Sequence, residues 1–344
     1  MKRFLLCPIL LLICMMGMLQ SFGTIATAQE KPAEPPKKEN EFEQRKALYL
    51  QISSLTGIPW YRLAAIDQYE RTITKVRPKT RKQLGEFVSV FVTEPGWTGE
   101  LNPDTEDQLP ASIRWFSGIG RDGDGDGLAK RTSDTDLLYS VADHFTHFGP
   151  SEEDFAIGAW QYYHNTRAVQ RVRQFSALYA HFGRLELFEH AFPLPIGTNY
   201  SYRGTWGTSR SWGGFRIHEG TDIFANYGIN VRSTCYGIVE IKGWNPYGGW
   251  RLGIRDLNNN YHYYAHLSGY EKNLRVGSIV KPGQLVGFVG SSGYGKPGTQ
   301  GKFPPHLHYG VYRDSGLIEW SFDPYPLLRQ WENSERRQLR QSNH

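Results

Sequence analysis

Three short segments decide how the C-terminal half of this sequence folds: His-Glu-Gly-Thr-Asp at 218–222, Tyr-Tyr-Ala-His-Leu at 263–267 and Pro-Pro-His-Leu-His at 304–308. Imidazole nitrogen and carboxylate oxygen are ligands that zinc prefers, and a catalytic zinc site has three protein ligands and one position for water. A single histidine is most often a surface or hydrogen-bonded residue. Four histidines and an aspartate in three motifs, set in a glycine-rich β pattern, predict a metal site.

The period of a β-strand predicts where these histidines point. Side chains two residues apart on a strand share a face, and neighbours lie on opposite faces. The third motif is therefore expected to present His306 and His308 on one face and Leu307 on the other. By the same rule His262 and His266 share a face of a second strand. His266 can then reach the site from that strand, whereas His262 is interpreted as a hydrogen-bonded bystander.

Two glycine-containing stretches support this arrangement. Gly220 is expected to provide the backbone freedom that brings His218 and Asp222 to one ion. The glycine-rich segment 290–301 lies just before the third motif, and neither a P-loop spacing nor a following helix is present. It is expected to form a wall of the substrate groove.

The motifs resemble those of the lysostaphin-like (LytM-type) zinc peptidases, which cut peptide cross-links and stems in bacterial peptidoglycan. The resemblance implies that His218, Asp222 and His308 are the zinc ligands. It also implies that His266 and His306 hold the catalytic water and the developing oxyanion. All five positions are filled, which favours an active enzyme.

The chemistry that this resemblance implies follows from electrostatics. Zinc lowers the pKa of bound water from about 16 to about 7. A neutral imidazole of His306 or His266 can accept the proton as the amide is attacked, and the metal and a protonated histidine stabilise the oxyanion. The resemblance covers roughly residues 192–325 and often includes an oxyanion-donating tyrosine near the first ligand. Here Trp212 and Phe215 occupy that neighbourhood.

The N-terminus predicts export. Residues 1–28 combine two basic residues, an apolar run over 4–19 and a small-residue cleavage site at 26–28, as in a secretory signal peptide. An uncleaved membrane anchor is the alternative, although the run is slightly short for a full span. The mature chain would keep one cysteine, Cys235, interpreted as a small core residue. These features predict a secreted protein, and the resemblance given above implies that it acts at the cell wall.

The 344 residues suffice for two domains and predict an α+β multidomain fold. Residues 29–42 form a proline-rich, charged linker. Apolar residues recur at helical spacing in 43–190, for example over 137–148, and predict a helical domain. Alternating patterns in 191–331 predict an antiparallel β-sheet domain, which the resemblance implies is the metallopeptidase domain. Residues 332–344 are expected to be a polar, frayed tail.

The distribution of charge indicates which classes of partner this chain could bind. The formal net charge is +5, and the basic residues are scattered rather than clustered. This distribution argues against a dedicated nucleic-acid protein and is compatible with an anionic polymer such as cell wall. Peptidoglycan is the expected partner, and a membrane is expected only if the signal segment is not cleaved.

The helical part carries a second resemblance. Residues 57–60, 63–66 and Glu70, with the glycine run at 118–127, resemble lytic-transglycosylase-like (lysozyme-like) domains. There the glutamate is the general acid for glycan cleavage, which implies this role for Glu70. The sequence departs from the pattern because Arg71 replaces the usual serine and the usual Gly-Leu-Met-Gln segment is not visible. An adjacent arginine favours the ionised carboxylate, so a structural or wall-positioning role is preferred.

A short acidic run allows a calcium interpretation. Asp122, Asp124 and Asp126 match the first half of a calcium loop, but Ser133 stands where the bidentate acid is expected. Asp134 and Asp136, which follow Ser133 within three residues, could substitute for that acid. A polar Asp-Gly turn is the alternative.

The whole-chain pattern is also similar to sporulation endopeptidases that cut the L-Ala–D-Glu bond of stem peptides during spore cortex maturation. That bond preference is implied by the resemblance and not by composition or spacing. Two rival functions remain. One is a non-catalytic wall-binding or amidase-activating factor with the same β fold, and the other is a bifunctional enzyme that also cleaves glycan through Glu70.

Overall fold

The computed structural model describes residues 40–211 and 214–342. The described residues belong to one compact unit. The predicted signal segment and the linker up to residue 39 lie outside the described residues. Of the helices that are described, none has the length and apolar character of a membrane span.

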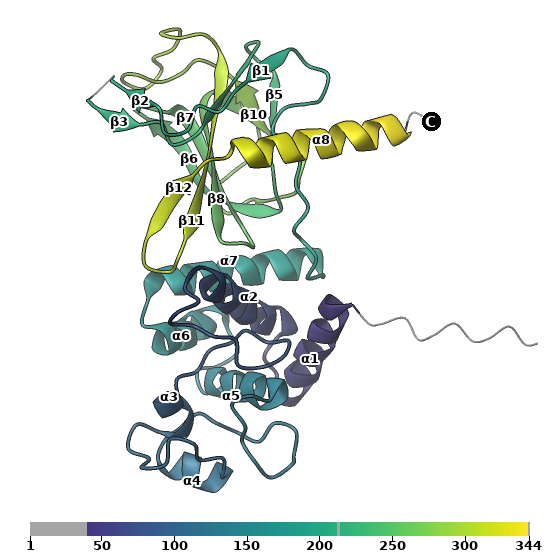
Figure 1. The fold of residues 1–344 in the computed structure, drawn as a ribbon, viewed down its shortest axis with the longest axis vertical. Coiled ribbons are helices and arrows are strands. Elements are labelled where there is room, and N and C mark those ends of the chain that lie inside the picture. The colour runs from purple at the N-terminus through teal and green to yellow at the C-terminus, as the bar shows by residue number, and fades with distance from the viewer. Residues whose placement is uncertain (1–39, 212–213, 343–344) are drawn as a thin grey trace, which may run out of the picture. The chain divides into compact units, whose positions relative to one another are not determined.

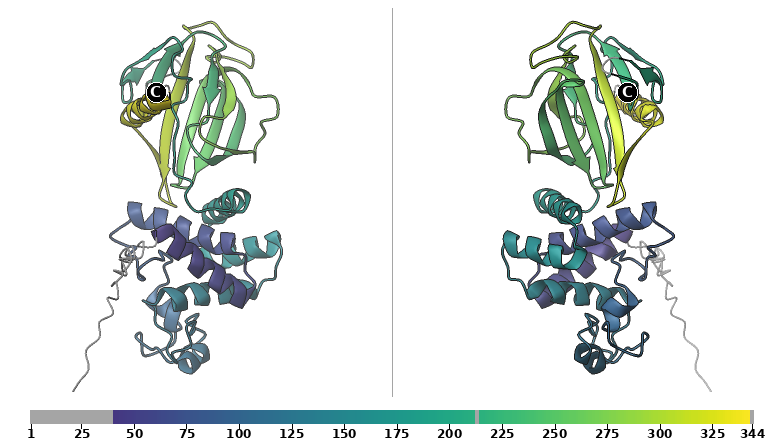
Figure 2. Two further views of the ribbon diagram at one scale, coloured as in Figure 1. Left: turned by 90° about the vertical axis from the view of Figure 1, so that its right-hand side faces the viewer. Right: turned by 90° about the vertical axis from the view of Figure 1, so that its left-hand side faces the viewer.

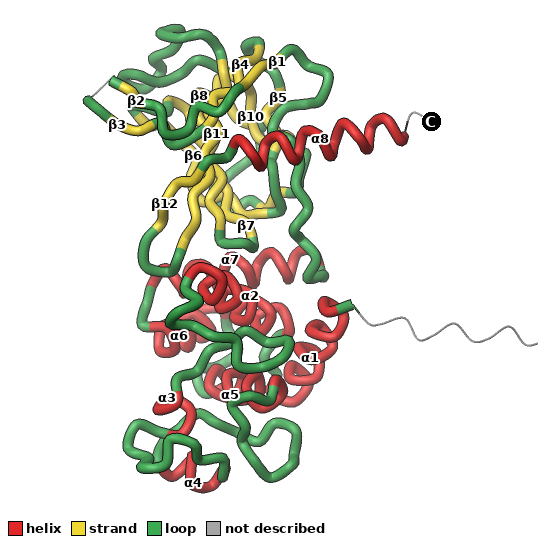
Figure 3. The backbone as a smooth tube through the Cα atoms, viewed as in Figure 1, coloured by secondary structure: helices red, strands yellow, loops and turns green. Residues whose placement is uncertain are grey.

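Helices make up the first part of the described chain, and strands make up most of the second (Figures 1 and 3). The helices before the sheet are α1 (Glu41–Thr56), α2 (Trp60–Val76), α3 (Glu94–Thr98), α4 (Pro110–Trp115), α5 (Asp134–Thr146), α6 (Glu152–Tyr163) and α7 (Thr166–Phe182). Helix α1 begins at Glu41, so the linker prediction was two residues too long. The Asn40 capping box stabilises this earlier start.

Local sequence explains where these helices begin and end. The Ser133 side chain caps α5 by accepting a hydrogen bond from the backbone N–H of Asp136. Gly57 and Gly183 are the C-cap residues that follow helices α1 and α7, and they have φ of 75° and 67°. Glycine adopts this left-handed conformation without steric cost. The predicted apolar stripe of α5 is buried in the helical core: Leu137, Leu138, Val141, Ala142 and Phe145.

The second part of the chain forms a ten-stranded sheet and a separate two-stranded one. The strands are β1 (Tyr200–Tyr202), β2 (Ser209–Arg210), β3 (Arg216–Ile217), β4 (Thr221–Ala225), β5 (Asn230–Arg232), β6 (Gly237–Asn245), β7 (Gly249–Asp256), β8 (Asn260–Tyr270), β9 (Ile279–Val280), β10 (Leu285–Val289), β11 (His306–Asp314) and β12 (Glu319–Phe322).

The large sheet brings the three motifs together. Its strand order is β1-β4-β11-β8-β7-β6-β9, so β11 lies between β4 and β8, and these pairs are antiparallel (Figure 2). Strands β7 and β8 pair across the turn before Asn260, with Ile254 opposite His262. The predicted alternation in β11 is confirmed. Leu307 is fully buried in the core, whereas His306 and His308 line a pocket on the other face.

Strand β8 departs from the predicted alternation near His266. Trp250 of β7 pairs with Leu267, and Leu252 pairs with Tyr264, so β8 has one more residue than β7 between these pairs. An extra residue of this kind is a β-bulge, which re-aims a side chain. His266 itself has φ of 62°, a left-handed conformation that is uncommon for a residue with a side chain.

The prediction that His262 and His266 share a face was therefore wrong. His262 hydrogen bonds to Asp256 (Nε2–Oδ2, 3.0 Å) and to the Tyr309 hydroxyl (Nδ1–O, 2.7 Å) in the buried interior. His266 lines the same pocket as His308. Hydrophobic periodicity cannot show a bulge, which is why simple alternation placed His262 and His266 on one face. His266 nevertheless reaches the pocket, as predicted.

The predicted C-terminal tail is also corrected. Residues Tyr325–Ser342 form helix α8, and its Trp331 and Glu332 are buried. Glu332 accepts hydrogen bonds from the hydroxyls of Tyr200 and Tyr202. Because this segment is mostly polar, its sequence did not indicate that one side of the helix packs on β1.

The helical part and the sheet are joined by buried charges. Arg171 of α7 forms ion pairs with Asp314 of β11 (Nε–Oδ2, 3.2 Å) and with Glu240 of β6. Arg255 pairs with the other oxygen of Glu240 at 3.0 Å. Buried charges need such partners, so this network ties the two parts together.

Candidate metal centre

Three side chains from separate segments converge on one point. His218 Nε2 lies 3.0 Å from Asp222 Oδ1 and 2.9 Å from His308 Nδ1, and His308 Nδ1 lies 3.0 Å from Asp222 Oδ1. Ligand atoms of a tetrahedral zinc ion, at about 2.0–2.1 Å from the metal, lie about 3.3 Å apart. The triangle therefore has nearly the size that three ligands of one zinc ion form, and its donor atoms suit zinc.

The sheet and a backbone carbonyl orient these ligands. Asp222 and His308 are directly opposite each other on β4 and β11. His218 Nδ1 lies 2.8 Å from the Thr205 carbonyl, so Nδ1–H donates to it and Nε2 keeps its lone pair for a metal. Burial opposes ionisation of Asp222, but hydrogen bonds with the two histidines hold its pKa well below the usual range. Arg210 Nη2 donates to its second oxygen at 2.5 Å.

Gly220 is needed for a different reason from the predicted one. Gly220 is not one of the described glycines that have a positive φ. A Cβ at this position would instead lie 2.7 Å from His308 Nε2 and 2.6 Å from the Tyr309 carbonyl oxygen. The close approach of the His308 ring, and not a left-handed backbone, therefore requires glycine here.

Gly220→Ala is expected to displace the His308 ring and to weaken zinc binding by about 10- to 100-fold, the usual cost of disturbing the residues that orient a ligand. Competition with a chromophoric chelator measures this affinity. Gly269→Ala is the matched control, because a Cβ there meets nothing within 4 Å. Equal zinc affinities of the two variants would contradict the packing argument.

His306 and His266 lie beside the triangle with one ring nitrogen free for chemistry. The Nδ1 atoms lie 2.8 Å from the carbonyls of Pro304 and Ser292, respectively, so each Nδ1–H donates and each Nε2 is left as an acceptor. His306 Nε2 is 3.7 Å from Asp222 Oδ1, and the two rings lie 4.8 Å apart. Burial lowers the pKa of both histidines. Both rings are therefore neutral near pH 7 and able to accept a proton.

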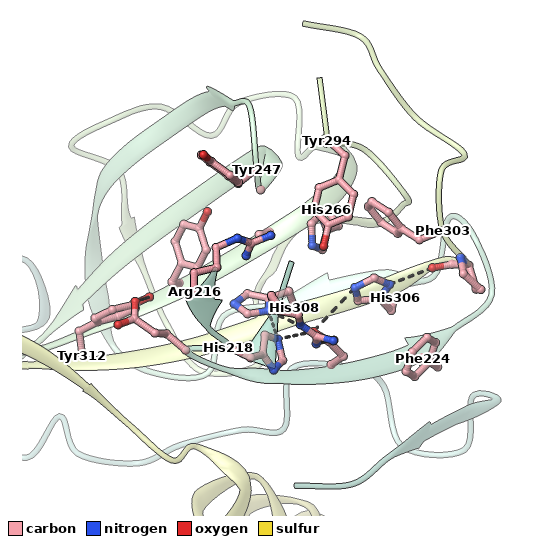
Figure 4. Close-up of a pocket in the computed structure, with 17 residues that line it drawn as sticks. Arg216, His218, Phe224, Tyr247, His266, Tyr294, Phe303, His306, His308 and Tyr312 are labelled. Atoms are coloured by element: carbon pink, nitrogen blue, oxygen red, sulfur yellow. Dashed lines mark hydrogen bonds and ion pairs between the residues drawn. The ribbon is translucent and has the colours of Figure 1, made fainter. Parts of the chain in front are cut away.

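The five predicted residues line one pocket of about 290 Å³ (Figure 4). Sequence reasoning missed several other residues of its wall: Arg210, Arg216, Tyr247, Tyr294 and Phe303. Tyr294 belongs to the glycine-rich segment, which is therefore a wall of the groove as predicted. Phe215, in the neighbourhood where an oxyanion tyrosine was sought, is 84% exposed, and Trp212 lies outside the described residues. Of the pocket tyrosines, Tyr247 and Tyr294 come from later turns, and Tyr263 and Tyr312 come from strands β8 and β11. No spacing rule connects any of them to His218.

A second group of possible ligands, His190, Asp256 and His262, lies in the interior. Asp256 and His262 already pair with each other. Lys75 and Arg313 lie in the adjacent pocket, and these positive charges disfavour a cation. The group therefore serves as a buried polar network, in agreement with the bystander interpretation of His262.

The acidic run is accounted for by its own hydrogen bonds. Asp122 accepts from the N–H groups of Gly125 and Gly127, and Asp126 pairs with Lys130. Asp136, not Asp126, joins Asp122 and Asp124 within ligand distance. Each of these carboxylates accepts backbone N–H bonds in the turn: Asp122, Asp124, Asp126 and Asp136. The polar-turn interpretation thus explains the segment without calcium.

Glu70 lies fully buried on α2 beside another pocket of about 290 Å³. Burial raises its pKa to about 7, although the Arg81 ion pair (Nη1–Oε2, 2.8 Å) opposes this shift. Arg71, which was expected to hold Glu70 ionised, instead contacts Asp67 and the Phe87 carbonyl. Helical geometry directs neighbouring side chains to different sides, so adjacency in sequence was misleading.

Glu70→Gln is expected to alter the pH dependence of stability. The folded carboxyl keeps its proton up to about pH 7, whereas the unfolded one releases it near pH 4.5. The folded state therefore binds the extra proton in this window, and stability falls by up to about 3 kcal/mol as pH rises through it. The variant should lack this fall. Denaturant unfolding of metal-free protein at about pH 5 and about pH 8 measures it, with exposed Glu153→Gln as the control. An unchanged pH slope in Glu70→Gln would contradict the assignment.

Comparison with known proteins agrees with this site. The family described as Peptidase family M23 matches residues 216–320. The L-Ala–D-Glu endopeptidase of Bacillus subtilis (strain 168) is 52% identical over 307 residues, which cover 89% of this chain and 94% of that protein. Lysostaphin of Staphylococcus simulans is 34% identical over 140 residues, 40% of this chain and 23% of that protein.

Among solved structures, a LytM glycyl-glycine endopeptidase from Ruminococcus gnavus is 36% identical, with 54% of this chain and 74% of that chain covered and a TM-score of 0.38. The similarity to the Bacillus subtilis protein extends over nearly all of that relative. The chain therefore belongs to peptidase family M23 and is a metallo-endopeptidase.

Proposed function

We propose that this protein is an exported zinc endopeptidase that hydrolyses peptidoglycan stem peptides at the L-Ala–D-Glu bond during spore cortex maturation. The observation that carries the peptidase assignment is the triangle of His218, Asp222 and His308 with two neutral histidines beside it. The bond is proposed from the Bacillus subtilis relative, which is named for it and is 52% identical to this chain. Export and the spore cortex role rest on the signal-like N-terminus and on the resemblance to sporulation endopeptidases.

The geometry supports a simple division of labour. His218, Asp222 and His308 would hold a zinc ion, which would supply Lewis-acid activation of water and of the scissile carbonyl. The neutral Nε2 atom of His306 or His266 accepts the proton that the attacking water releases. The resulting imidazolium then stabilises the negative oxygen of the tetrahedral intermediate. The backbone carbonyls that bind each Nδ1–H fix the tautomer that this role requires.

A wall-binding factor without catalysis is the rival, and the site argues against it. Such a factor has no need for three aligned ligand atoms or for two imidazoles with free Nε2 atoms. Here His218 is held in the ligand tautomer by Thr205, and Gly220 leaves room for His308. The fixed tautomer of His218 and the space left for His308 serve metal binding, and they therefore favour an active enzyme.

Digestion of purified peptidoglycan by the mature protein, with and without a chelator, tests the proposal. The expected result is new D-Glu amino termini that disappear when zinc is removed and return when it is restored. Other new amino termini would keep the peptidase and change the bond. No new amino termini, or termini that form in the presence of chelator, would refute the metallopeptidase.

Glycan cleavage through Glu70 is the second candidate, favoured by one observation: a buried carboxyl with a pKa raised to about 7 lines a pocket. A general acid needs a raised pKa of this kind. New reducing or anhydro glycan ends in the same digest, lost in Glu70→Gln and retained with chelator, would establish this activity. Their absence from the wild-type digest would leave the helical part without a catalytic role.

A further inference from the structure

Arg216 occupies a central place in the pocket of the metal centre. It lies on β3, two residues before His218, and both side chains line the pocket. Its guanidinium carbon is 5.0 Å from the Tyr247 ring centroid and 5.8 Å from that of Tyr294. The Tyr294 ring is in turn 6.0 Å from the His266 ring. Figure 4 shows Arg216 among these residues, beside the histidines that would carry out the reaction.

The hydrogen bonding of Arg216 is incomplete. Its Nε and Nη2 atoms are buried and have no hydrogen-bond partner. These two nitrogens form one edge of the guanidinium plane, and their parallel N–H bonds match the two oxygens of a carboxylate. A buried charged donor without an acceptor is costly. The contacts with the tyrosine rings do not use these N–H bonds, so this edge of the guanidinium lacks an acceptor within the described residues.

No other described arginine has this combination. Arg210, on the neighbouring strand of the same pocket, pairs with Asp222 at 2.5 Å. Buried Nε atoms without partners also occur in Arg62, Arg71, Arg232 and Arg251. The first three have an ion pair through a terminal nitrogen, and Arg251 has no second nitrogen of this kind. Within residues 40–211 and 214–342, Arg216 alone has two such nitrogens, and no carboxylate pairs with it there. A permanent positive charge without a counterion thus faces the reaction site.

The proposed substrate carries the missing group. In an L-Ala–D-Glu bond, the residue that contributes the scissile nitrogen is a glutamyl residue with two carboxyl groups. The peptide continues through only one of them, so the other remains an ionised carboxylate close to the scissile bond. A glycyl-glycine bond has no such charge.

We propose that Arg216 recognises this free carboxylate through Nε and Nη2, and so selects peptides with an acidic residue immediately after the scissile bond. The inference rests on the proposed function and adds the residue that determines specificity. The tyrosine rings on either side hold the guanidinium by cation–π contacts and leave its edge for the carboxylate.

Two synthetic stem peptides test the proposal: one with the free carboxylate of D-Glu, and one with a carboxamide in its place. Wild-type, zinc-loaded enzyme is expected to cleave the carboxylate peptide with kcat/KM about 10- to 100-fold higher, the range for a charge-assisted pair. Arg216→Gln should lose this preference through its effect on the carboxylate peptide alone. Zinc content and unfolding temperature should stay at wild-type values in this variant.

Two further variants complete the test. Arg216→Lys keeps a cation over the tyrosine rings but lacks the paired N–H edge, so it should fold even if Arg216→Gln does not, and it should lose most of the preference. Arg275→Gln removes an exposed arginine elsewhere in the domain and should match the wild type.

Each adverse result has a distinct meaning. Equal cleavage of both peptides by the wild type would overturn the role of Arg216 and leave the bond assignment intact. An equal loss on both peptides in the Arg216 variants, with zinc retained, would also overturn it, because a structural role predicts that pattern. Cleavage of neither peptide by zinc-loaded wild type would refute the bond assignment and the Arg216 proposal together.

Discussion

His308→Ala is expected to lose zinc and peptidase activity together. His308 Nδ1 is one corner of the ligand triangle, 2.9 Å from His218 Nε2 and 3.0 Å from Asp222 Oδ1. A carboxylate and one imidazole cannot complete the three-ligand set of a catalytic zinc site. We expect affinity to fall by more than about 100-fold, beyond the cost of disturbing residues that only orient the ligands. Zinc content after dialysis and hydrolysis of stem peptides measure the two losses.

His181→Ala is the matched control for His308→Ala, because it removes an exposed histidine of α7 far from the ligand set in sequence. It should retain zinc and activity. Full zinc content in His308→Ala would show that the ion is held elsewhere, and the triangle would then lose its assigned role.

His306→Ala has the second large expected effect, and it should separate zinc binding from catalysis. His306 shares a face with His308, but its Nε2 lies 3.7 Å from Asp222 Oδ1, outside the tight triangle. The variant should therefore keep zinc while kcat falls by about 10²- to 10⁴-fold, the usual contribution of a general acid or base. Zinc content and kcat measured on one preparation give the comparison.

His266→Ala provides the companion measurement, because the His266 ring lies 4.8 Å from that of His306 and its Nε2 is equally free. It too should retain zinc and lose turnover. Zinc loss in His306→Ala as severe as that in His308→Ala would overturn the division between ligands and proton-transfer residues.

Much of the site could be predicted because residues close in sequence obey simple geometry. His306, Leu307 and His308 alternate as any strand does, and the structure places them accordingly. The short connection between β3 and β4 also keeps His218 and Asp222 close together. Such patterns depend only on the local backbone period, which the sequence carries directly.

The remainder depended on features that no local pattern encodes. The bulge that turns His266 into the pocket arises from the pairing of β7 with β8. Arg216 and Tyr294 meet only because a hairpin and a distant loop fold over the same groove. Helix α8 was mistaken for a tail because its buried side, which includes Trp331, is narrow within a strongly polar segment.

The opposition of Asp222 and His308 across β4 and β11 has a consequence for how the protein matures. These residues are 86 positions apart in the chain, so they meet only after distant strands have paired, and such long-range pairing is slow. In a nascent chain only His218 and Asp222 are close enough to bind zinc together, and we expect two ligands to be too few to retain the ion. We therefore expect zinc uptake to be a late step, and enzymatic competence to mark the completion of the sheet.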